Sequence, residues 1–567
     1  MLGAANGLLW WLSFPPVFFW PLALVSPVPL MYLGMRTRCG WRGAVGAVLG
    51  ALPAWGITHW WILDISAAGG PALILYMAAW TGIAAWTIAR VRRSLPWLAW
   101  WVMLPVVWIG VEYLRGEVVL NGYPWYLAGS PLVGATMLGA AAKIGGSFGV
   151  YGASMVSALA STMVLAALRA RHKGWGDVGR VGAVLGAYLV IAALIGGPSG
   201  GDEAGVLKVA AVQTNVPQSN KDSRSATQRL QDFSTALRLT SEAAHAKVRP
   251  DVIAWPETMF PGESLTADAI EEERRSGLGF REINLPLTGW YDELMRLQRD
   301  LGVPMIVGSI AIDGLTITAG PKGFEFKDKG RFNSAFLVED GTPRTERYDK
   351  IGLTPFGETM PYISNWKWLE RQLLALGANG MEFDLGAGKL ATRLDVPRAE
   401  GGPIRVATPI CFEATMAGVV RKLAVDPETG APAGLIINLT NDGWFSGSDW
   451  GRENHLLAAR WRSVELGLAV VRAANTGISA LILPDGRVSQ QGPTAPDGDP
   501  SPTGARVAGV MAVEAPVFRP MEGGRTFYAR HGDLIGRACM LLTLGMFAAV
   551  LGTLWLNRRA NKQASVA

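Results

Sequence analysis

The segment IRVATPICFE, residues 404–413, decides how the polar part of this chain folds. Its apolar run predicts a buried strand, and the residues after it are typical of a helix. Similar apolar runs surround it, with helix-like segments between them. Such runs indicate a sheet covered on both faces, so we predict a layered α/β domain in which 262–290 and 313–330 are surface loops. The other predicted strands cover 206–216, 252–257, 304–312, 331–338, 434–442, 468–475 and 478–486, and helices are predicted near 224–247 and 291–301.

Cys411 closes this strand and is the only cysteine between residues 200 and 534. A lone thiol at a strand end is a candidate nucleophile. The alternative is a buried, inert cysteine.

Two charged residues support the hypothesis that Cys411 is a nucleophile. Glu257 ends the apolar run VIAWPE, and Lys350 lies in RYDKIGLTPFGE, residues 347–358. A carboxylate can remove the thiol proton, and an ammonium can bind the oxyanion together with the backbone N–H of Phe412. Taken singly, each has a structural alternative: Glu257 can cap a helix, and Lys350 can form a surface salt bridge with Glu358 or Glu413.

The acidic residues divide the chain. Only four of the 46, Asp64, Glu112, Glu117 and Asp177, occur in the first 200 residues. We therefore predict a transmembrane domain of seven helices over 1–200, a catalytic domain over 201–530, and a final transmembrane helix and tail over 531–567. The eight predicted spans are a two-helix hairpin within 1–33 and the runs 42–63, 70–90, 95–114, 140–168, 179–197 and 537–556. A cleaved signal peptide is the alternative for 1–33, but this run is long and lacks a basic start.

The positions of the basic residues predict how the chain is oriented across the membrane. Ten of the twelve Lys and Arg residues before residue 200 fall in three alternating loops, 36–42, 90–93 and 169–180. Such loops are typical of the cytoplasmic side, which puts 198–534 outside the cytoplasm. The net charge of +6 follows from this topology and does not indicate nucleic-acid binding.

The sequence indicates neither a metal site nor a cofactor site. Its five histidines are scattered, and the glycine-rich run at 145–152 lies in a predicted span, where it favours helix packing. His455 is predicted to be a structural or surface residue rather than a base.

The segments WPE, RYDKIGLTPFGE, PICFE and NLTNDGWF (438–445) resemble the nitrilase superfamily, whose members carry a Glu–Lys–Cys triad on a four-layer αββα sandwich. With the flanking spans, the chain resembles the apolipoprotein N-acyltransferase family over nearly its whole length, from LRGEVVLNGYPWYLAG (114–129) to RTFYARHGD (525–533).

This resemblance implies an acyl transfer at the periplasmic face of the inner membrane. Cys411 would take an acyl chain from a phospholipid as a thioester and pass it to the N-terminal amine of a diacylglyceryl-modified lipoprotein. Glu257 would act as base, Lys350 and the Phe412 N–H would hold the oxyanion, and Glu358 would orient the lysine. Glu413 matches an acid of the family pattern. No cofactor is implied.

The chain departs from the family pattern at two positions. Asp222 stands where many members carry an aromatic residue, and Phe412 replaces a more usual Tyr. We expect the second change to leave oxyanion binding intact, because the backbone N–H is the same.

Aromatic residues suggest a route for lipid. Trp366 lies in an amphipathic run, 365–376, that could rest on the bilayer or dock on the domain's own core. Trp444 and Phe445 open the run WFSGSDW, a candidate lid or a packing element.

Two other classes of function stay open. In a membrane-tethered amidase or nitrilase-type hydrolase, water would resolve the acyl-enzyme, although a tether needs one span rather than eight. A non-catalytic lipid-binding or transport protein would leave the triad unexplained.

Overall fold

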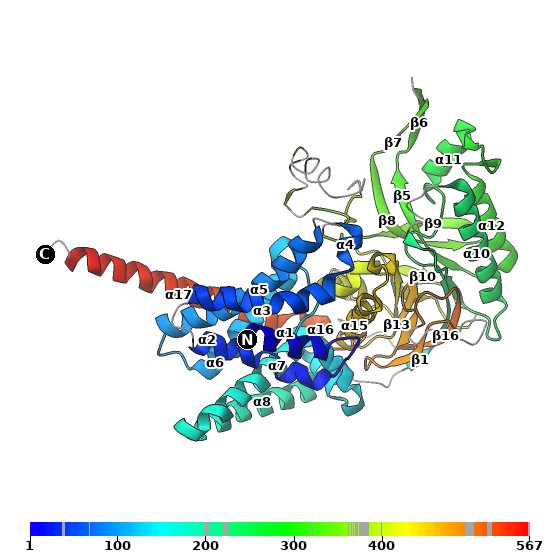
Figure 1. The fold of residues 1–567 in the computed structure, drawn as a ribbon. Helices are drawn as coiled ribbons and strands as arrows, with labels where there is room; N and C mark the ends of the chain where they lie inside the picture. The colour runs from blue at the N-terminus through cyan, green and yellow to red at the C-terminus, as the bar shows by residue number, and fades with distance from the viewer. Residues whose placement is uncertain are drawn as a thin grey trace. The chain divides into compact units, whose positions relative to one another are not determined.

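The computed structural model describes residues 1–36, 40–66, 69–197, 203–218, 225–320, 323–355, 357–360, 362–363, 366, 368, 372, 385–398, 400–493, 504–518 and 524–564. The chain forms two compact units (Figure 1). The first holds Met1–Gly197 and Thr526–Ala567, and the second holds Pro198–Leu374 and Gly380–Arg525.

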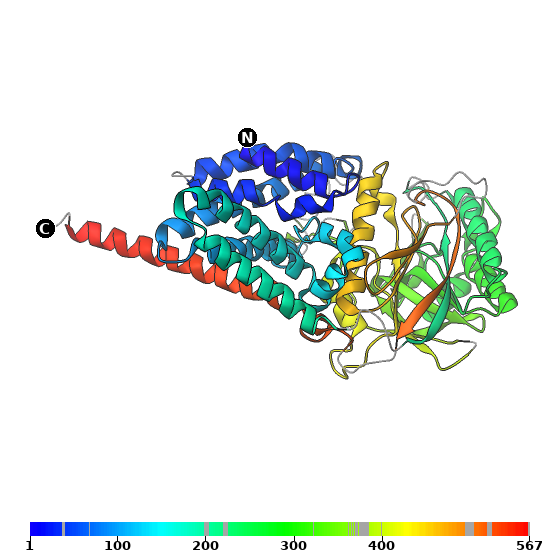
Figure 2. The same cartoon turned by 90° about the horizontal axis from the view of Figure 1, so that it is seen from below.

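The first unit is helical. Its α-helices are α1 (Leu2–Ser13), α2 (Val28–Arg36), α3 (Gly40–His59), α4 (Ile62–Ile65), α5 (Gly69–Ser94), α6 (Trp100–Tyr113), α7 (Ala140–Lys173), α8 (Gly176–Ile195), α16 (Phe527–His531) and α17 (Leu534–Ala564). Short helical turns are η1 (Trp20–Leu24), η2 (Leu114–Val118), η3 (Val119–Asn121) and η4 (Ser130–Leu138). In Figure 2 the long helices run side by side, and the red α17 packs along α6 and α5.

Every predicted span coincides with a helix. Among the described residues, four helical segments are long and apolar enough to cross a membrane by themselves: Gly69–Ser94, Ala142–Lys173, Gly176–Ile195 and Leu534–Leu556. The other predicted spans correspond to α1, α2, α3 and α6, which are shorter or less apolar. The structure is therefore consistent with about eight spans in a membrane protein.

Close helix contacts in this unit depend on small residues. A Cβ atom on Gly50 of α3 would lie 2.6 Å from the backbone nitrogen of Ala4 in α1. The backbones of α1 and α3 thus approach more closely than side chains would allow, as is common between helices in lipid.

The basic helix ends lie near one another. Arg92, at the end of α5, donates to the carbonyl of Met35, at the end of α2. Arg169, near the end of α7, lies over the ring of Trp100 at the start of α6, 4.8 Å from its centroid. The indole N–H of Trp100 donates to Asp177 at the start of α8 (3.1 Å).

The second unit contains two six-stranded sheets. The first has the order β16-β1-β2-β5-β8-β9, and the second has the order β10-β11-β12-β13-β14-β15. The strands of the first are β1 (Glu203–Gln213), β2 (Val252–Ala254), β5 (Met305–Asp313), β8 (Gly330–Glu339), β9 (Thr342–Asp349) and β16 (Gly509–Phe518). Those of the second are β10 (Leu394–Val396), β11 (Ile404–Ala407), β12 (Leu435–Thr440), β13 (Val470–Ala474), β14 (Ala480–Ile482) and β15 (Val488–Gln491).

Helices cover the outer faces of both sheets. On the first lie α10 (Ala226–Ala244) and α12 (Gly289–Leu301), whose Phe233, Trp290 and Leu294 bury the ring of Trp255. On the second lie α14 (Ala417–Ala424) and α15 (Asp449–Leu466), while β1 and β16 of the first sheet pack against β13 and β12 of the second. These four layers confirm the predicted αββα sandwich.

The two insertions are more ordered than predicted. Residues 262–290 contain α11 (Ala267–Ser276) and the paired strands β3 (Gly279–Phe280) and β4 (Leu285–Pro286), and 313–330 contains the hairpin β6 (Thr316–Gly320) with β7 (Gly323–Lys327). Ala269 of α11 packs with Ile312 and Leu315 in a small core. The prediction of plain loops was wrong because these apolar side chains come from segments far apart in the sequence and meet only in the folded chain.

A pair of glycines in α3 tests the close packing of the first unit. We expect Gly50→Ala to destabilise the protein by about 1–3 kcal/mol, because the added methyl group meets the backbone of α1. Gly46→Ala, in the same helix, is the control, because a Cβ there has nothing within 4 Å. Thermal unfolding in detergent would measure the stability of both variants. Equal unfolding midpoints would contradict the close contact between α1 and α3.

Candidate active site

Glu257 lies in the turn that follows β2. The backbone N–H of Met259 donates to the carbonyl of Gly308 on the neighbouring strand β5 (3.0 Å), which folds the turn over that strand. A Cβ on residue 308 would lie 2.2 Å from the carbonyl oxygen of Pro256, so only glycine fits there. The Glu257 side chain is thereby fixed in the interior, with 5% of its surface exposed.

Lys350 follows β9 directly. Its backbone N–H donates to the carbonyl of Asn333 (2.8 Å), and its own carbonyl accepts from Gly388 (2.7 Å). Its ammonium Nζ lies 2.8 Å from Glu358 Oε2 and 3.4 Å from Glu257 Oε1. The structure thus brings these three predicted residues together around one buried cation.

The charges stabilise one another. Burial alone would lower the pKa of Lys350, but the carboxylates of Glu358 and Glu257 outweigh burial and raise that pKa. Burial opposes the charged form of Glu358 as well, and Lys350 outweighs it, so the pKa of Glu358 is lowered. Lys350 is therefore an ammonium and Glu358 a carboxylate at neutral pH.

Two asparagines orient Glu257. The side-chain amide of Asn333, on β8, donates to Glu257 Oε1 (2.7 Å) and to Glu358 Oε1 (3.2 Å). The backbone N–H of Asn441, just after β12, donates to Glu257 Oε2 (2.9 Å). Because β8 and β12 belong to different sheets, Glu257 joins the two halves of the sandwich.

Cys411 lies past its strand rather than at its end. The strand β11 stops at Ala407, Ile410 makes one parallel bridge with Leu439, and Cys411 begins the turn η6 (Cys411–Thr415). Its φ of +49° lies in the left-handed region, which is uncommon for a residue with a side chain. The half-buried thiol lies 3.9 Å from the carbonyl of Asn441, the residue that also donates to Glu257.

The thiol is protonated at rest. Burial raises the pKa of Cys411, the charge of Glu257 raises it further, and Lys350 only partly opposes both. A nearby base is therefore needed when the sulfur reacts.

Glu413, two residues after the cysteine, is fully buried and ties the turn to the lysine loop. Its Oε2 accepts from the N–H of Ile410 (2.7 Å). Its Oε1 accepts from the N–H groups of Ile351 and Gly352 (both 2.8 Å) and from the Tyr348 hydroxyl (2.7 Å). Phe412, whose side chain is buried, follows the cysteine within the same turn.

The residues predicted to touch lipid differ in exposure. Trp366 is 68% exposed, Trp444 is half-buried, and Phe445 is buried with its ring 5.9 Å from that of His455. Asp222 and most of the amphipathic run 365–376 lie outside the described residues.

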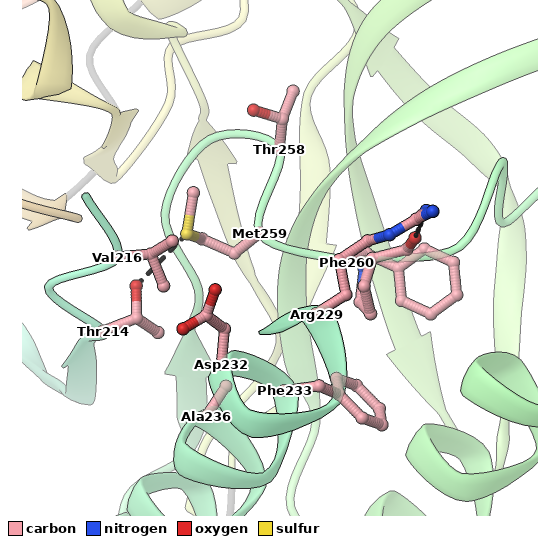
Figure 3. Close-up of a pocket in the computed structure, with 10 residues that line it drawn as sticks. Thr214, Val216, Arg229, Asp232, Phe233, Ala236, Thr258, Met259 and Phe260 are labelled. Atoms are coloured by element: carbon pink, nitrogen blue, oxygen red, sulfur yellow. Dashed lines mark hydrogen bonds between the residues drawn. The ribbon is translucent and has the colours of Figure 1, made fainter. Parts of the chain in front are cut away.

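A separate cavity of about 180 Å³ adjoins the Glu257 turn (Figure 3). It is lined by Thr258, Met259 and Phe260 from that turn and by residues of α10, including Arg229 and Asp232. Figure 3 shows Thr214 joined to the sulfur of Met259, a contact of 3.1 Å. Neither Cys411 nor Lys350 is among the residues that line it.

Sequence reasoning missed the supporting polar residues. Asn333 interrupts the apolar strand RFNSAFLV, and Arg472 interrupts VVRAA, although both strands are buried. A polar residue within such a strand signals a buried partner. The partner itself is decided only by the fold. In the part of the chain that the structure describes, no cluster of three or more His, Cys, Asp or Glu residues could hold a metal ion.

Comparisons with known proteins agree with this architecture. Residues 6–163 match the apolipoprotein N-acyltransferase N-terminal domain, and residues 208–498 match the carbon–nitrogen hydrolase family. An apolipoprotein N-acyltransferase of Geobacter metallireducens is 27% identical, covering 99% of this chain and 96% of that protein. One of Azotobacter vinelandii is 29% identical over 87% of this chain and 86% of its own length.

Among solved structures, Nit3 of Saccharomyces cerevisiae, a nitrilase-superfamily member, matches with 14% identity and a TM-score of 0.32 over 56% of this chain and 93% of its own. The match to the carbon–nitrogen hydrolase family spans half of the sequence, and a second conserved domain precedes it. The chain therefore belongs to the carbon–nitrogen hydrolase family, in the branch that joins this domain to an apolipoprotein N-acyltransferase N-terminal domain.

Proposed function

We propose that the chain is an apolipoprotein N-acyltransferase in which Cys411 carries the acyl group. The observation that supports this most directly is the buried Lys350 between Glu257 and Glu358, next to the Cys411 turn. The names of the relatives give the reaction class. The donor would be a membrane phospholipid and the acceptor a lipoprotein with a diacylglyceryl-modified N-terminal cysteine.

In the first half-reaction Glu257 takes the thiol proton while the sulfur attacks the ester carbonyl carbon. The oxyanion is held by the ammonium of Lys350 and the backbone N–H of Phe412. The ester C–O bond then breaks, Glu257 returns the proton to the leaving oxygen, and a lysophospholipid departs. Cys411 keeps the acyl chain as a thioester.

In the second half-reaction the lipoprotein α-amine attacks the thioester. Glu257 accepts a proton from the amine, the C–S bond breaks, and the sulfur recovers a proton as the amide is released. Glu358 keeps Lys350 charged and in place, and Glu413 fixes the turn relative to the lysine loop. Trp366 and Trp444 are the proposed lipid contacts, while the buried Phe445 packs inside the domain.

We propose the inner membrane as the location, with the catalytic domain on its periplasmic face. The basic ends of α2, α5 and α7 support this orientation, because they match the three basic loops of the sequence and the contacts among helix ends bring them near one another.

Incubation with phospholipid alone tests the proposed chemistry. We expect mass spectrometry to detect an acyl adduct on the Cys411 peptide, and we expect a diacylated lipopeptide to remove it. Cys411→Ser and Glu257→Gln should each reduce adduct formation by at least about 100-fold, since one removes the nucleophile and the other its base. Steady release of free fatty acid without an amine acceptor would instead indicate a hydrolase.

Stability measurements test the buried ion cluster. Lys350→Met leaves the carboxylates of Glu257 and Glu358 buried without their cation, so we expect a loss of about 3–5 kcal/mol. Lys350→Met combined with Glu358→Gln should recover part of that stability and none of the activity. Thermal unfolding and the adduct assay would separate the two effects. Full activity in the double variant would contradict the role of Lys350.

Alkylation tests the protonation state of Cys411. Because its pKa is raised, the fraction of thiolate should still be increasing above about pH 10, where a thiol with the ordinary pKa of about 8.5 is almost fully ionised. The rate of iodoacetamide labelling of the Cys411 peptide should therefore still rise above about pH 10. Lys350→Met should slow labelling at any one pH, because the ammonium lowers the pKa of the thiol. A labelling rate that levels off by about pH 10 would contradict this interpretation.

A further inference from the structure

A buried polar network lies behind the nucleophile turn. The ring Nε2 of His455, on α15, is 3.0 Å from the carbonyl oxygen of Cys411, and its Nδ1 is 2.8 Å from Asp442 Oδ1. His455 is 1% exposed and Asp442 is fully buried. The proposed reaction gives neither residue a part.

Asp442 is held as a carboxylate by its buried partners. Arg472 Nη2 donates to Asp442 Oδ2 (2.5 Å), and the hydroxyl of Thr440 donates to Oδ1 (3.0 Å). Burial works against the charge, but Arg472 and His455 outweigh it and hold the pKa of Asp442 well below its usual range. Arg472 is itself fixed by Asn438 Oδ1 (3.2 Å), whose amide donates to the carbonyl of Pro409 (2.9 Å).

This surrounding fixes the ring of His455. A carbonyl oxygen only accepts, so Nε2 carries a proton and donates to Cys411. Nδ1, at the other end of the ring, lies 2.8 Å from Asp442 Oδ1 and 3.1 Å from Arg472 Nη2. The carboxylate and the guanidinium thus hold the ring with its Nε2–H directed at the Cys411 carbonyl.

The hydrogen bond from His455 acts on the peptide group that carries the proposed oxyanion donor, the N–H of Phe412. The carbonyl of Cys411 and the N–H of Phe412 belong to the same planar group, and in a trans peptide they point in opposite directions. A donor that fixes the carbonyl also fixes the N–H. A hydrogen bond to the carbonyl draws electron density toward its oxygen and makes the N–H a stronger donor. The left-handed φ of Cys411 makes such support necessary, because that conformation is costly for a residue with a side chain.

We propose that His455 is a positioning residue that orients and polarises the Cys411–Phe412 peptide for binding the oxyanion. The inference rests on the proposed function, in which the Phe412 N–H receives the developing charge. Asp442 and Arg472 hold the imidazole ring in place. His455 acts through the peptide and does not exchange a proton with the substrate.

Two reactions of the same thiol test this role in the full-length protein. Acylation by phospholipid passes through an oxyanion, whereas alkylation by iodoacetamide does not. We expect His455→Leu to lower the acylation rate by about 10- to 100-fold, which does not exceed the loss seen when an oxyanion donor is removed altogether. The alkylation rate should not change. His455→Gln keeps an N–H donor but loses the ring nitrogen that Asp442 and Arg472 hold in place, so it should lie between the wild type and His455→Leu.

The ratio of the two rates does not depend on how much protein is folded, because both report on the same active centres. If His455→Leu does not fold, the ratio for His455→Gln decides, and a ratio equal to that of the wild type overturns the proposal. His245→Gln, at an exposed residue of the same domain, is the control and should leave both rates unchanged.

Other outcomes are equally decisive. An unchanged acylation rate in His455→Leu overturns the role of His455. Equal losses of acylation and alkylation also overturn it, because they indicate a residue that only maintains the turn. A wild-type protein that forms no acyl adduct on Cys411 refutes the proposed function itself, and this inference with it.

Discussion

A single buried ammonium, that of Lys350, organises the proposed active centre of this protein. Lys350 is almost completely enclosed, and an isolated charge in that position would be strongly unfavourable. The carboxylates of Glu358 and Glu257 make its burial possible, and the lysine in turn keeps two acids together in the interior. Removal of any one partner leaves a buried charge, so the cluster constrains the chain around it.

Both sheets of the sandwich are needed to assemble the proposed active centre, because each sheet supplies part of its residues. The loops of the first sheet supply Glu257, Lys350 and Glu358, whereas the second supplies Cys411 and Asn441. Bonds across the division maintain the alignment: the Asn441 N–H reaches Glu257, and Glu413 accepts from both the lysine loop and the cysteine turn. The spacing of the proposed nucleophile and base is therefore set by how the two sheets pack.

The electrostatics fit the proposed role of the thiol. Burial keeps Cys411 protonated at rest, and the nearby ammonium of Lys350 would favour the negative charge that develops when the sulfur attacks. Behind the same turn, His455 links the Cys411 carbonyl to the buried carboxylate of Asp442. The first unit adds apolar helices, four of which, among the residues that the structure describes, are long and apolar enough to cross a membrane, the layer in which the proposed acyl donor resides.

The sequence by itself determined the division into membrane and polar parts, the strands of the sandwich and the residue types of the candidate centre. These follow from local information: apolar runs, the distribution of acids, and a lone cysteine, acid and lysine at strand ends. Only the tertiary structure decided that Cys411 lies beyond its strand with a left-handed backbone, and that His455 faces inward to the carbonyl of Cys411. It alone also showed that Asn333 and Asn441 donate to Glu257, and that Ala269 of the 262–290 insertion packs on Ile312 and Leu315. Each of these depends on contacts between segments far apart in the chain, whose register is fixed only when the two sheets pack together.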